Sequence, residues 1–200
     1  MGESQQKQKI VAAILAGGLS SRMGTPKAGV RLSSGLTVFE TVWRILDGLN
    51  LPRIIVGHAQ GIESTSLGKP IIIPDAVERR GPVGALLGLL QSGLGTHYLV
   101  VGCDQILLTP DLLQTLVSEV AGRPIVLGRP DGRVSPLPAL IPETAIRHVE
   151  ELLCHEQASL RKLLEIADAR TISISEKEFE RLRSVNTPQD LAELDRSLNQ

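Results

Sequence analysis

Short apolar runs recur along the chain and alternate with segments whose apolar residues have helical spacing. The runs are rich in β-branched residues and occupy residues 10–15, 54–56, 71–73, 98–101 and 125–127. Runs this short, with no polar face, are typical of parallel strands that are covered on both faces. We therefore predict a strand at each run and expect all of them to be buried in one sheet.

Helical patterns fill the intervals between these strands. Residues 37–50 place their apolar side chains on one stripe, which predicts an amphipathic helix, whereas residues 83–90 are apolar all round and predict a buried helix. Two further helices are expected to begin at Thr109-Pro110 and Thr187-Pro188, because Thr is a good N-cap and Pro fits the first helical position.

The alternation is less regular after residue 130. A strand is expected at 137–141, helices at 143–153 and 159–166, and a late strand at 171–175 before the terminal helix. Strands and helices that alternate in this way predict a doubly wound α/β fold, with a mostly parallel sheet and helices on both faces. No linker or repeat divides the sequence, so we expect a single domain over residues 1–200, with 1–9 as a flexible segment.

The composition narrows the possible functions. The 21 basic and 22 acidic residues nearly cancel, and one Trp, one Tyr and two Phe are too few for a series of base-stacking platforms. Both facts disfavour nucleic-acid binding. The uncharged segment 81–103 is interrupted by glycines and polar residues, which favours a buried helix and strand over a membrane span. We expect no membrane association.

Two features favour a cytoplasmic location. The polar N-terminal residues lead into a short apolar run that lacks the cleavage site of a secretory signal. Cys103 and Cys154 match no metal-ligand spacing and are expected to be free, buried thiols, as is usual in a reducing compartment.

The strongest chemical signal lies where the first predicted strand ends, in the segment LAGGLSSRMGTPK at residues 15–27. Glycines let backbone N–H groups approach phosphate oxygens, and Arg22 and Lys27 supply positive charge, so this glycine loop is an expected anion-binding site. It differs from a Walker A loop, since Pro26 precedes Lys27, and it lacks a G-x-G dinucleotide motif. A glycine-rich turn with two solvated basic side chains is the alternative.

Two carboxylates follow later strands. Asp75 comes after residues 71–73, and Asp104 comes after residues 98–101. Because parallel strands bring their carboxyl ends to one edge, both acids should face the glycine loop. Carboxylates beside a phosphate site suit Mg²⁺, which usually takes one or two of them together with substrate phosphates. Helix capping or simple solvation is the alternative for each acid.

The sequence shows no constellation for acid–base or nucleophilic catalysis. The four histidines have no ligand spacing, and Ser20 and Ser21 have no evident base. Such groups are not needed when a substrate phosphate, already ionised near neutral pH, attacks the α-phosphate of a nucleoside triphosphate. Nucleotidyl transfer is therefore one reaction class that is compatible with this absence, and in it the protein supplies position, cations and Mg²⁺.

Residues 15–27 match every defined position of the signature L-A-[GA]-G-x-S-x-R-M-G-x-x-K, and the chain resembles the molybdenum cofactor guanylyltransferases within the nucleotidyltransferase superfamily. The resemblance implies a Rossmann-like fold and Mg²⁺-dependent transfer of GMP from GTP to the terminal phosphate of molybdopterin cofactor, with release of pyrophosphate. Further matches follow in the same order, at Pro74-Asp75, Gly81-Pro82, Cys103-Asp104, 136–140 and Asn186-Thr187-Pro188.

The same resemblance assigns roles to individual residues. It implies a monomer or weak oligomer with transient contacts to other proteins that make or receive the cofactor. The implied catalytic residues are Arg22, Lys27 and Asp104, and the metal ligand is Asp104. The implied acceptor residues are Gly81, Pro136 and Asn186. The implied nucleotide-binding residues are Leu15, Ala16, Gly17, Gly18, Lys27, Asp75 and Asp104.

Three positions depart from the family pattern. Gln105-Ile106 stand where x-Pro usually follows the metal-binding acid, Gly57 where an Asn is common, and Ser184 where the usual N-x-N-T-P begins. We expect the first to change only the shape of the loop, and the others to remove possible contacts to the nucleotide and the pterin. Gly17-Gly18 favours guanine over the Ala-Gly of cytidylyl relatives. A transferase that uses CTP or another small phosphorylated acceptor is the alternative, and a non-catalytic nucleotide- or cofactor-binding protein is a further one.

Overall fold

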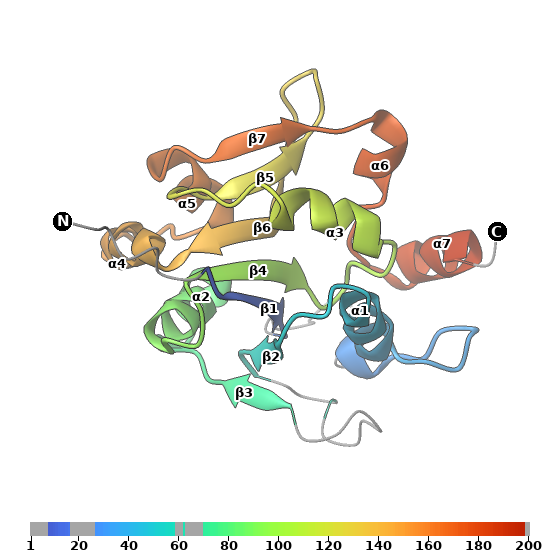
Figure 1. Ribbon diagram of the computed structural model, residues 1–200. Coiled ribbons are helices and arrows are strands. Elements are labelled where there is room, and N and C mark those ends of the chain that lie inside the picture. The colour runs from blue at the N-terminus through green and yellow to red at the C-terminus, as the bar shows by residue number, and fades with distance from the viewer. Residues whose placement is uncertain (1–7, 17–26, 59–61, 63–69, 199–200) are drawn as a thin grey trace.

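The computed structural model describes residues 8–16, 27–58, 62 and 70–198. Figure 1 shows one sheet with helices packed on both of its faces. The sheet has seven strands in the order β3-β2-β1-β4-β6-β5-β7. Each strand predicted from the sequence overlaps one of them. In chain order they are β1 (Ile10–Leu15), β2 (Arg53–Val56), β3 (Ile71–Ile73), β4 (His97–Gly102), β5 (Ile125–Gly128), β6 (Val134–Pro142) and β7 (Arg170–Ser173).

Neighbouring strands are parallel except at β6. The pairs β1–β2, β1–β4, β2–β3 and β5–β7 are parallel, whereas β6 is antiparallel to both β4 and β5. The short turn at residues 129–133 explains this exception, because so short a connection joins only antiparallel strands. The predicted doubly wound, mostly parallel α/β fold is confirmed.

Several helices begin at the capping residues that the sequence marks. Thr37, Thr109 and Ser159 each accept a backbone hydrogen bond at the start of α1 (Val38–Asp47), α3 (Pro110–Val117) and α5 (Leu160–Ile166). The short helix α6 (Glu176–Glu180) was not predicted, and its cap Ser175 ends the expected strand early. The other helical elements are α2 (Gly81–Gln91), α4 (Ile146–Leu153), α7 (Pro188–Leu198) and the 3₁₀ turns η1 (Lys27–Gly29) and η2 (Glu143–Ala145).

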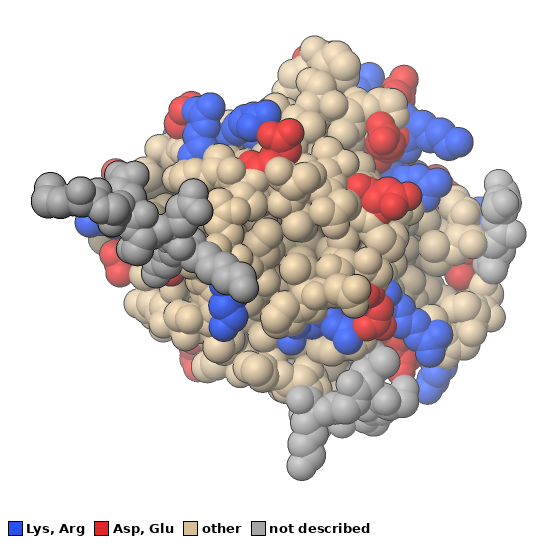
Figure 2. Space-filling model, in the orientation of Figure 1, with Lys and Arg blue, Asp and Glu red and all other residues tan. Residues whose placement is uncertain are grey.

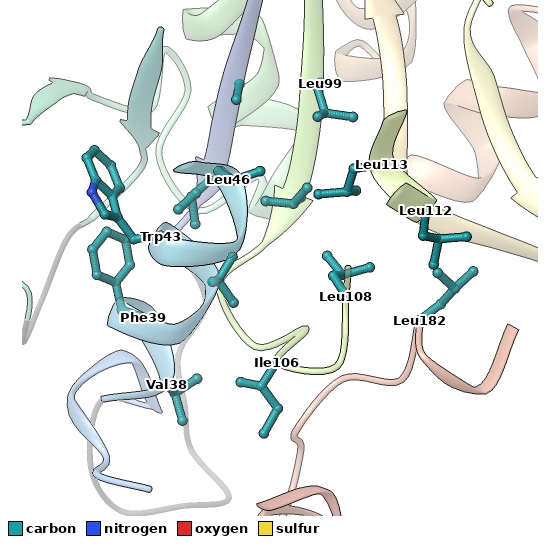
Figure 3. Close-up of a cluster of buried hydrophobic side chains, with 14 of the residues drawn as sticks. Val38, Phe39, Trp43, Leu46, Leu99, Ile106, Leu108, Leu112, Leu113 and Leu182 are labelled. Carbon is teal, nitrogen blue, oxygen red and sulfur yellow. The ribbon is translucent and has the colours of Figure 1, made fainter. Parts of the chain in front are cut away.

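Alternate residues of the strands face two separate cores. Ala12 of β1 belongs to the core beneath α1 and α3, and the next residue, Ala13, belongs to the core beneath α2, α4 and α5. Figure 3 shows the first core, in which Phe39 and Trp43 of α1 lie beside each other. Their ring centroids are 5.6 Å apart. Strands that are covered on both faces need apolar residues at every position, which explains the continuous apolar runs.

Two expectations about burial are wrong. Ile71 and Ile72 of β3 expose 55% and 49% of their surface. The reason is that β3 lies at the edge of the sheet, where only β2 pairs with it. Cys103 and Cys154 are both free, as expected, but Cys103 is half-buried and Cys154 is exposed.

The uncharged segment 81–103 forms α2, which is largely buried in the second core, and β4, whose buried residues alternate between the two cores. This confirms the predicted buried helix and strand. Among the described helices, none combines the length and the apolar character that crossing a membrane requires.

Candidate functional site

The carboxyl ends of four neighbouring strands lie in one row. Leu15 of β1 is in register with Val56 of β2 on one side and with Gly102 of β4 on the other, and Val56 is in register with Ile73 of β3. The glycine loop and the segments that carry the two predicted carboxylates therefore leave the sheet at one edge. We call this edge the nucleotide rim, after the ligand that the sequence predicts there.

Both ends of the glycine loop are anchored in the fold. Leu15 and Ala16 are buried, and the Ala16 N–H donates to the Val56 carbonyl oxygen at 2.8 Å. After the loop, η1 places Ala28 in the core beneath α1. The roles of the loop's own side chains stay predictions, because these lie outside the described part of the chain: Gly17, Gly18, Arg22 and the side chain of Lys27.

Asp75 lies in the connection between β3 and α2. Its Oδ1 atom is buried and has no hydrogen-bond partner among the described residues. Leaving a buried polar atom without a partner costs about 1–3 kcal/mol, and more when the group is charged. A ligand N–H group that donated to this oxygen would remove that cost, so Asp75 is suited to hold a ligand.

The Asp75 connection packs directly on the backbone of α2. The Ala76 N–H donates to the Gly84 carbonyl oxygen at 3.2 Å. A Cβ atom at Gly84 would lie 2.2 Å from the Val77 carbonyl oxygen, which is too close for any side chain. Glycine at this position therefore allows the connection to approach the helix.

We expect Gly84→Ala to displace the Asp75 connection and to weaken nucleoside triphosphate binding roughly tenfold, or about 1.4 kcal/mol. The free energy of unfolding should fall, because overpacking costs about 1–3 kcal/mol and the better helix propensity of Ala returns only about 1 kcal/mol. Calorimetric titration and urea unfolding measure the two effects. The matched control is Gly122→Ala, since a Cβ there would meet nothing within 4 Å. Unchanged binding by Gly84→Ala would show that the connection does not hold the ligand.

Asp104 lies in a tight turn after β4. The Gln105 N–H donates to the Gly102 carbonyl oxygen at 3.3 Å, and the Gly102 N–H donates to Gln105 Oε1 at 2.9 Å. A Cβ at Gly102 would lie 2.8 Å from Asp104 Oδ1, so the carboxylate folds back over the end of β4. The Asp104 carbonyl oxygen accepts a hydrogen bond from the Val185 N–H at 2.9 Å. The turn therefore joins the carboxylate to the segment that precedes α7.

The three predicted acceptor residues lie at two parts of the rim. Pro136 is in β6, the antiparallel neighbour of β4, and Asn186 follows the residue that bonds to the Asp104 backbone. Gly81 instead begins α2, directly after the connection that carries Asp75. Pro136 and Asn186 therefore lie in segments that are hydrogen-bonded to the Asp104 turn, and Gly81 begins the helix that follows the Asp75 connection.

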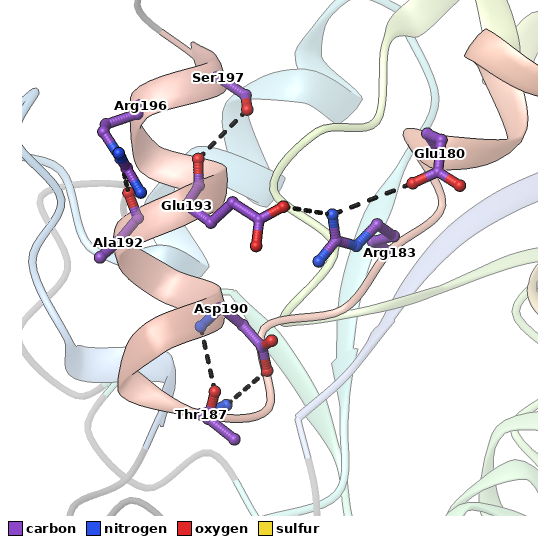
Figure 4. A network of polar contacts seen from close by, with 8 residues as sticks. All are labelled: Glu180, Arg183, Thr187, Asp190, Ala192, Glu193, Arg196 and Ser197. Atoms are coloured by element: carbon purple, nitrogen blue, oxygen red, sulfur yellow. Dashed lines mark hydrogen bonds and ion pairs between the residues drawn. The ribbon is translucent and has the colours of Figure 1, made fainter.

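Asn186 is held by the cap of α7. Asp190 Oδ2 accepts hydrogen bonds from the backbone N–H groups of Asn186 at 3.0 Å and Thr187 at 2.8 Å. The pKa of Asp190 is lowered, chiefly by the bond from the Asn186 backbone N–H and next by the hydrogen bond with the Thr187 side chain. The cap is therefore present at neutral pH and is lost as the pH falls through the lowered pKa. Figure 4 also shows Arg183, which donates to Glu193 Oε1 at 2.7 Å and fastens the preceding segment to α7.

Asp75 follows β3 and Asp104 follows β4, and these two strands are separated by three strand-to-strand spacings in the sheet. β2 and β1 lie between β3 and β4, and three spacings of about 4.8 Å place the strand ends about 14 Å apart. Magnesium binds its ligands at about 2.0–2.1 Å, so this separation favours different roles for the two carboxylates. Asp75 suits a part of an extended ligand that is distant from its phosphates, and Asp104 suits the metal-bound phosphates.

Among the described residues, no group of three or more His, Cys, Asp or Glu side chains is placed to bind a metal. A single carboxylate on the rim still fits Mg²⁺, because this ion usually keeps several waters and binds one or two carboxylates together with substrate phosphates. Asp104 therefore fits the ion only in combination with a phosphate-bearing substrate.

A pocket that the sequence did not indicate opens between the β5–β6 turn and α5. Its volume is about 730 Å³, and Pro136 lies in its wall together with Val134, Arg133 and Arg161. Sequence reasoning missed it because these walls come from elements far apart in the chain. Figure 2 shows basic and acidic side chains next to one another on the visible face of the molecule.

Comparisons with known proteins show the family of this chain. The model of the MobA-like NTP transferase domain family matches residues 12–173. A probable molybdenum cofactor guanylyltransferase of Rhodopirellula baltica is 31% identical over 197 residues, which cover 91% of this chain and 90% of the relative. A molybdenum cofactor guanylyltransferase of Serratia proteamaculans is 27% identical over 188 residues, covering 92% of each chain.

Solved structures show the same fold. The crystal structure of molybdopterin-guanine dinucleotide biosynthesis protein A from Archaeoglobus fulgidus matches with a TM-score of 0.78 and 21% identity, covering 94% of this chain and 98% of that one. The family match spans the strands that form the nucleotide rim, and the glycine loop carries the signature of these enzymes. The chain therefore belongs to the MobA-like NTP transferase family and is a nucleotidyltransferase.

Proposed function

We propose that this protein transfers GMP from GTP to the terminal phosphate of molybdopterin cofactor, in the cytoplasm and with Mg²⁺. The observation that supports the proposal is the row of strand ends, in which Asp75 follows β3 and Asp104 follows β4, on opposite sides of β1, the strand that leads into the glycine loop. A nucleotide that lay along this row would have its base near one carboxylate and its phosphates near the other. The names of the relatives support guanine as the base and molybdopterin as the acceptor.

The nucleotide base lies on the β3 side of the rim in this proposal. The buried Asp75 Oδ1 has no partner among the described residues. Guanine offers a carboxylate two adjacent donors, its ring N1–H and its exocyclic amino group, whereas adenine and cytosine offer one amino group beside a ring acceptor. The few aromatic residues of the chain limit stacking on the base, so recognition depends on polar and backbone contacts. Gly81, at the start of α2, lies in the same part of the rim.

The phosphates lie over the glycine loop, with Arg22 and Lys27 as their cations. Asp104 is the residue that would hold Mg²⁺, and the bound ion would neutralise charge that develops on the transferred and leaving phosphates. The turn around Asp104 is fixed by hydrogen bonds from Gly102, Gln105 and Val185. This carboxylate is therefore positioned before any substrate binds.

The acceptor approaches from the β4 and β6 side. Pro136 and Asn186 lie in segments that meet the Asp104 turn, and the pocket beside Pro136 has a volume of about 730 Å³. Pockets for small molecules usually have volumes of about 300–1,000 Å³. The wall is mixed in charge, because Arg133 and Arg161 line it together with Asp131, Glu165 and Asp168. The two guanidinium groups are the ones that would contact the phosphate of the acceptor.

The reaction needs no catalytic base. A phosphate oxygen of the acceptor, already ionised, attacks the α-phosphorus of GTP, and the bond from that phosphorus to the bridging oxygen breaks as pyrophosphate leaves. The protein holds the two phosphates in line and keeps cations at the leaving group.

A comparison of donors tests this proposal. Purified protein, molybdopterin cofactor and Mg²⁺ are incubated with GTP, CTP or ATP, and pyrophosphate release is measured over many turnovers. We expect release with GTP, and at least about tenfold lower kcat/KM with CTP or ATP, because cytosine and adenine place a ring acceptor where guanine has its N1–H donor and so leave the carboxylate incompletely paired.

Each other outcome contradicts a defined part of the proposal. A preference for CTP would change the assigned base, and release with a different phosphorylated acceptor alone would change the assigned acceptor. Tight GTP binding without turnover would show a binding protein in place of an enzyme. Omission of Mg²⁺, with chelator present, should abolish release.

A further inference from the structure

Gln105 is the most completely buried polar residue of the described chain, and the proposed reaction gives it no role. Only 2% of its surface is exposed. Its Oε1 accepts a hydrogen bond from the Gly102 N–H, and its Nε2 donates to the carbonyl oxygens of Leu137 and Leu182, each bond being 2.9 Å long. Both N–H groups of the amide and its oxygen are therefore used.

These bonds join three segments that are distant in sequence. Gly102 ends β4 and begins the turn that carries Asp104. Leu137 follows Pro136 in β6, and Leu182 begins the segment that leads to Asn186. One side chain thus connects the metal-binding turn to both segments that we assign to the acceptor on the β4 side.

The chain supports this connection at two further points. The Val185 N–H donates to the Asp104 carbonyl oxygen at 2.9 Å, so the turn and the segment before Asn186 are bonded through their backbones as well. The next residue, Ile106, is fully buried in the core beneath α1 and α3. Gln105 is therefore held from both sides and cannot turn to solvent without opening the core.

We propose that Gln105 is a positioning residue that sets the distance between Asp104 and the segments that hold the acceptor. The inference rests on the proposed function, since it concerns the same transfer reaction. In-line attack requires the acceptor phosphate to be positioned against the α-phosphate with a tolerance of about 0.5 Å. The buried Gln105 amide, bonded to both the Asp104 turn and the acceptor segments, supplies that constraint.

The test compares Gln105→Met with Gln114→Met. The first substitution keeps the side chain's length but removes the Gln105 bonds to the Gly102 N–H and to the Leu182 carbonyl oxygen, and it leaves the Leu137 carbonyl oxygen with the Ser135 hydroxyl as donor. Gln114 lies exposed on α3, and no hydrogen bond of its side chain is found within the described residues. Far-UV circular dichroism and thermal unfolding verify the fold of both variants, and kcat and both KM values are then measured with GTP and molybdopterin cofactor.

For Gln105→Met, we expect a fall in kcat of about 10- to 100-fold, the range typical of residues that orient a metal ligand. We also expect a higher KM for the acceptor, whereas the KM for GTP should change less than about twofold, since the base and the glycine loop lie on the other side. Gln114→Met should match the wild type. A folded Gln105→Met protein with unchanged kcat and acceptor KM would overturn the inference, because a merely structural residue lowers stability alone.

A second measurement does not depend on turnover. Binding of Mn²⁺ in the presence of GTP, without acceptor, is followed by electron paramagnetic resonance. Weaker Mn²⁺ binding by Gln105→Met supports the inference even if the wild type forms no product, and equal binding contradicts the positioning of Asp104. If Gln105→Met does not fold, Gln105→Glu replaces it, because a carboxylate keeps the acceptor for Gly102 and loses both donors. Weaker Mn²⁺ binding by this second variant would then support the inference, and equal binding would contradict it.

Discussion

Asp104→Asn is expected to lower pyrophosphate release by on the order of 10²–10³-fold, equivalent to about 2.7–4 kcal/mol of transition-state stabilisation. The amide has the shape of the carboxylate and leaves the backbone bonds of the turn to Gln105 and Val185 unchanged. It lacks the negative charge that Mg²⁺ prefers in its ligands, so the metal-bound phosphates lose their anchor on the protein. The rate is measured at saturating GTP and acceptor, over a range of Mg²⁺ concentrations.

The control for this prediction is Asp111→Asn. Asp111 lies exposed in the first turn of α3, where its charge affects only the helix. Losing an acid there changes stability by about 0.3–1 kcal/mol and should leave the rate unchanged. If Asp104→Asn releases pyrophosphate as fast as this control, Asp104 does not hold the metal.

The order of strands and helices could be predicted because local rules decide it. Residues 10–15 form β1 as expected, since a short run that contains β-branched residues and is soon followed by glycines favours a strand. The place of each strand in the sheet could not be predicted in the same way. Residues 71–73 are as apolar as residues 10–15, yet β3 lies at the edge and exposes Ile71. Which strands become neighbours is decided by tertiary packing, and the local pattern of apolar residues does not predict it.

The candidate site divides along the same line. The sequence predicted that Asp75 and Asp104 would follow strands at one edge, and the register of β1, β2, β3 and β4 bears this out. The sequence could not predict that two strands separate these acids, because this depends on the order of the strands in the sheet. Gln105 was expected to affect only the shape of a loop, but its amide bonds to segments more than thirty residues away. The available signal was a polar residue directly before the apolar residues 106–108.

Lys27→Ala is expected to lower kcat/KM for GTP by on the order of 10²–10³-fold, the loss that follows removal of one group that stabilises transition-state charge. The family resemblance assigns this ammonium to the GTP phosphates, and it is the last defined residue of the glycine loop signature. The protein should stay folded, because η1 is anchored by Ala28 in the core and by the Val38 N–H, which donates to the Val30 carbonyl oxygen at 2.9 Å.

Lys9→Ala is the matched control, since Lys9 is exposed and precedes β1, at the opposite end of that strand from the nucleotide rim. Both variants lose one positive charge, so any effect of net charge on GTP binding is the same in the two proteins. Lys27→Arg adds a further comparison, because it keeps the charge and changes its geometry. Partial activity in Lys27→Arg and none in Lys27→Ala would indicate that charge is needed near the phosphates. A rate for Lys27→Ala equal to that of Lys9→Ala would instead leave phosphate binding to the backbone N–H groups of the loop.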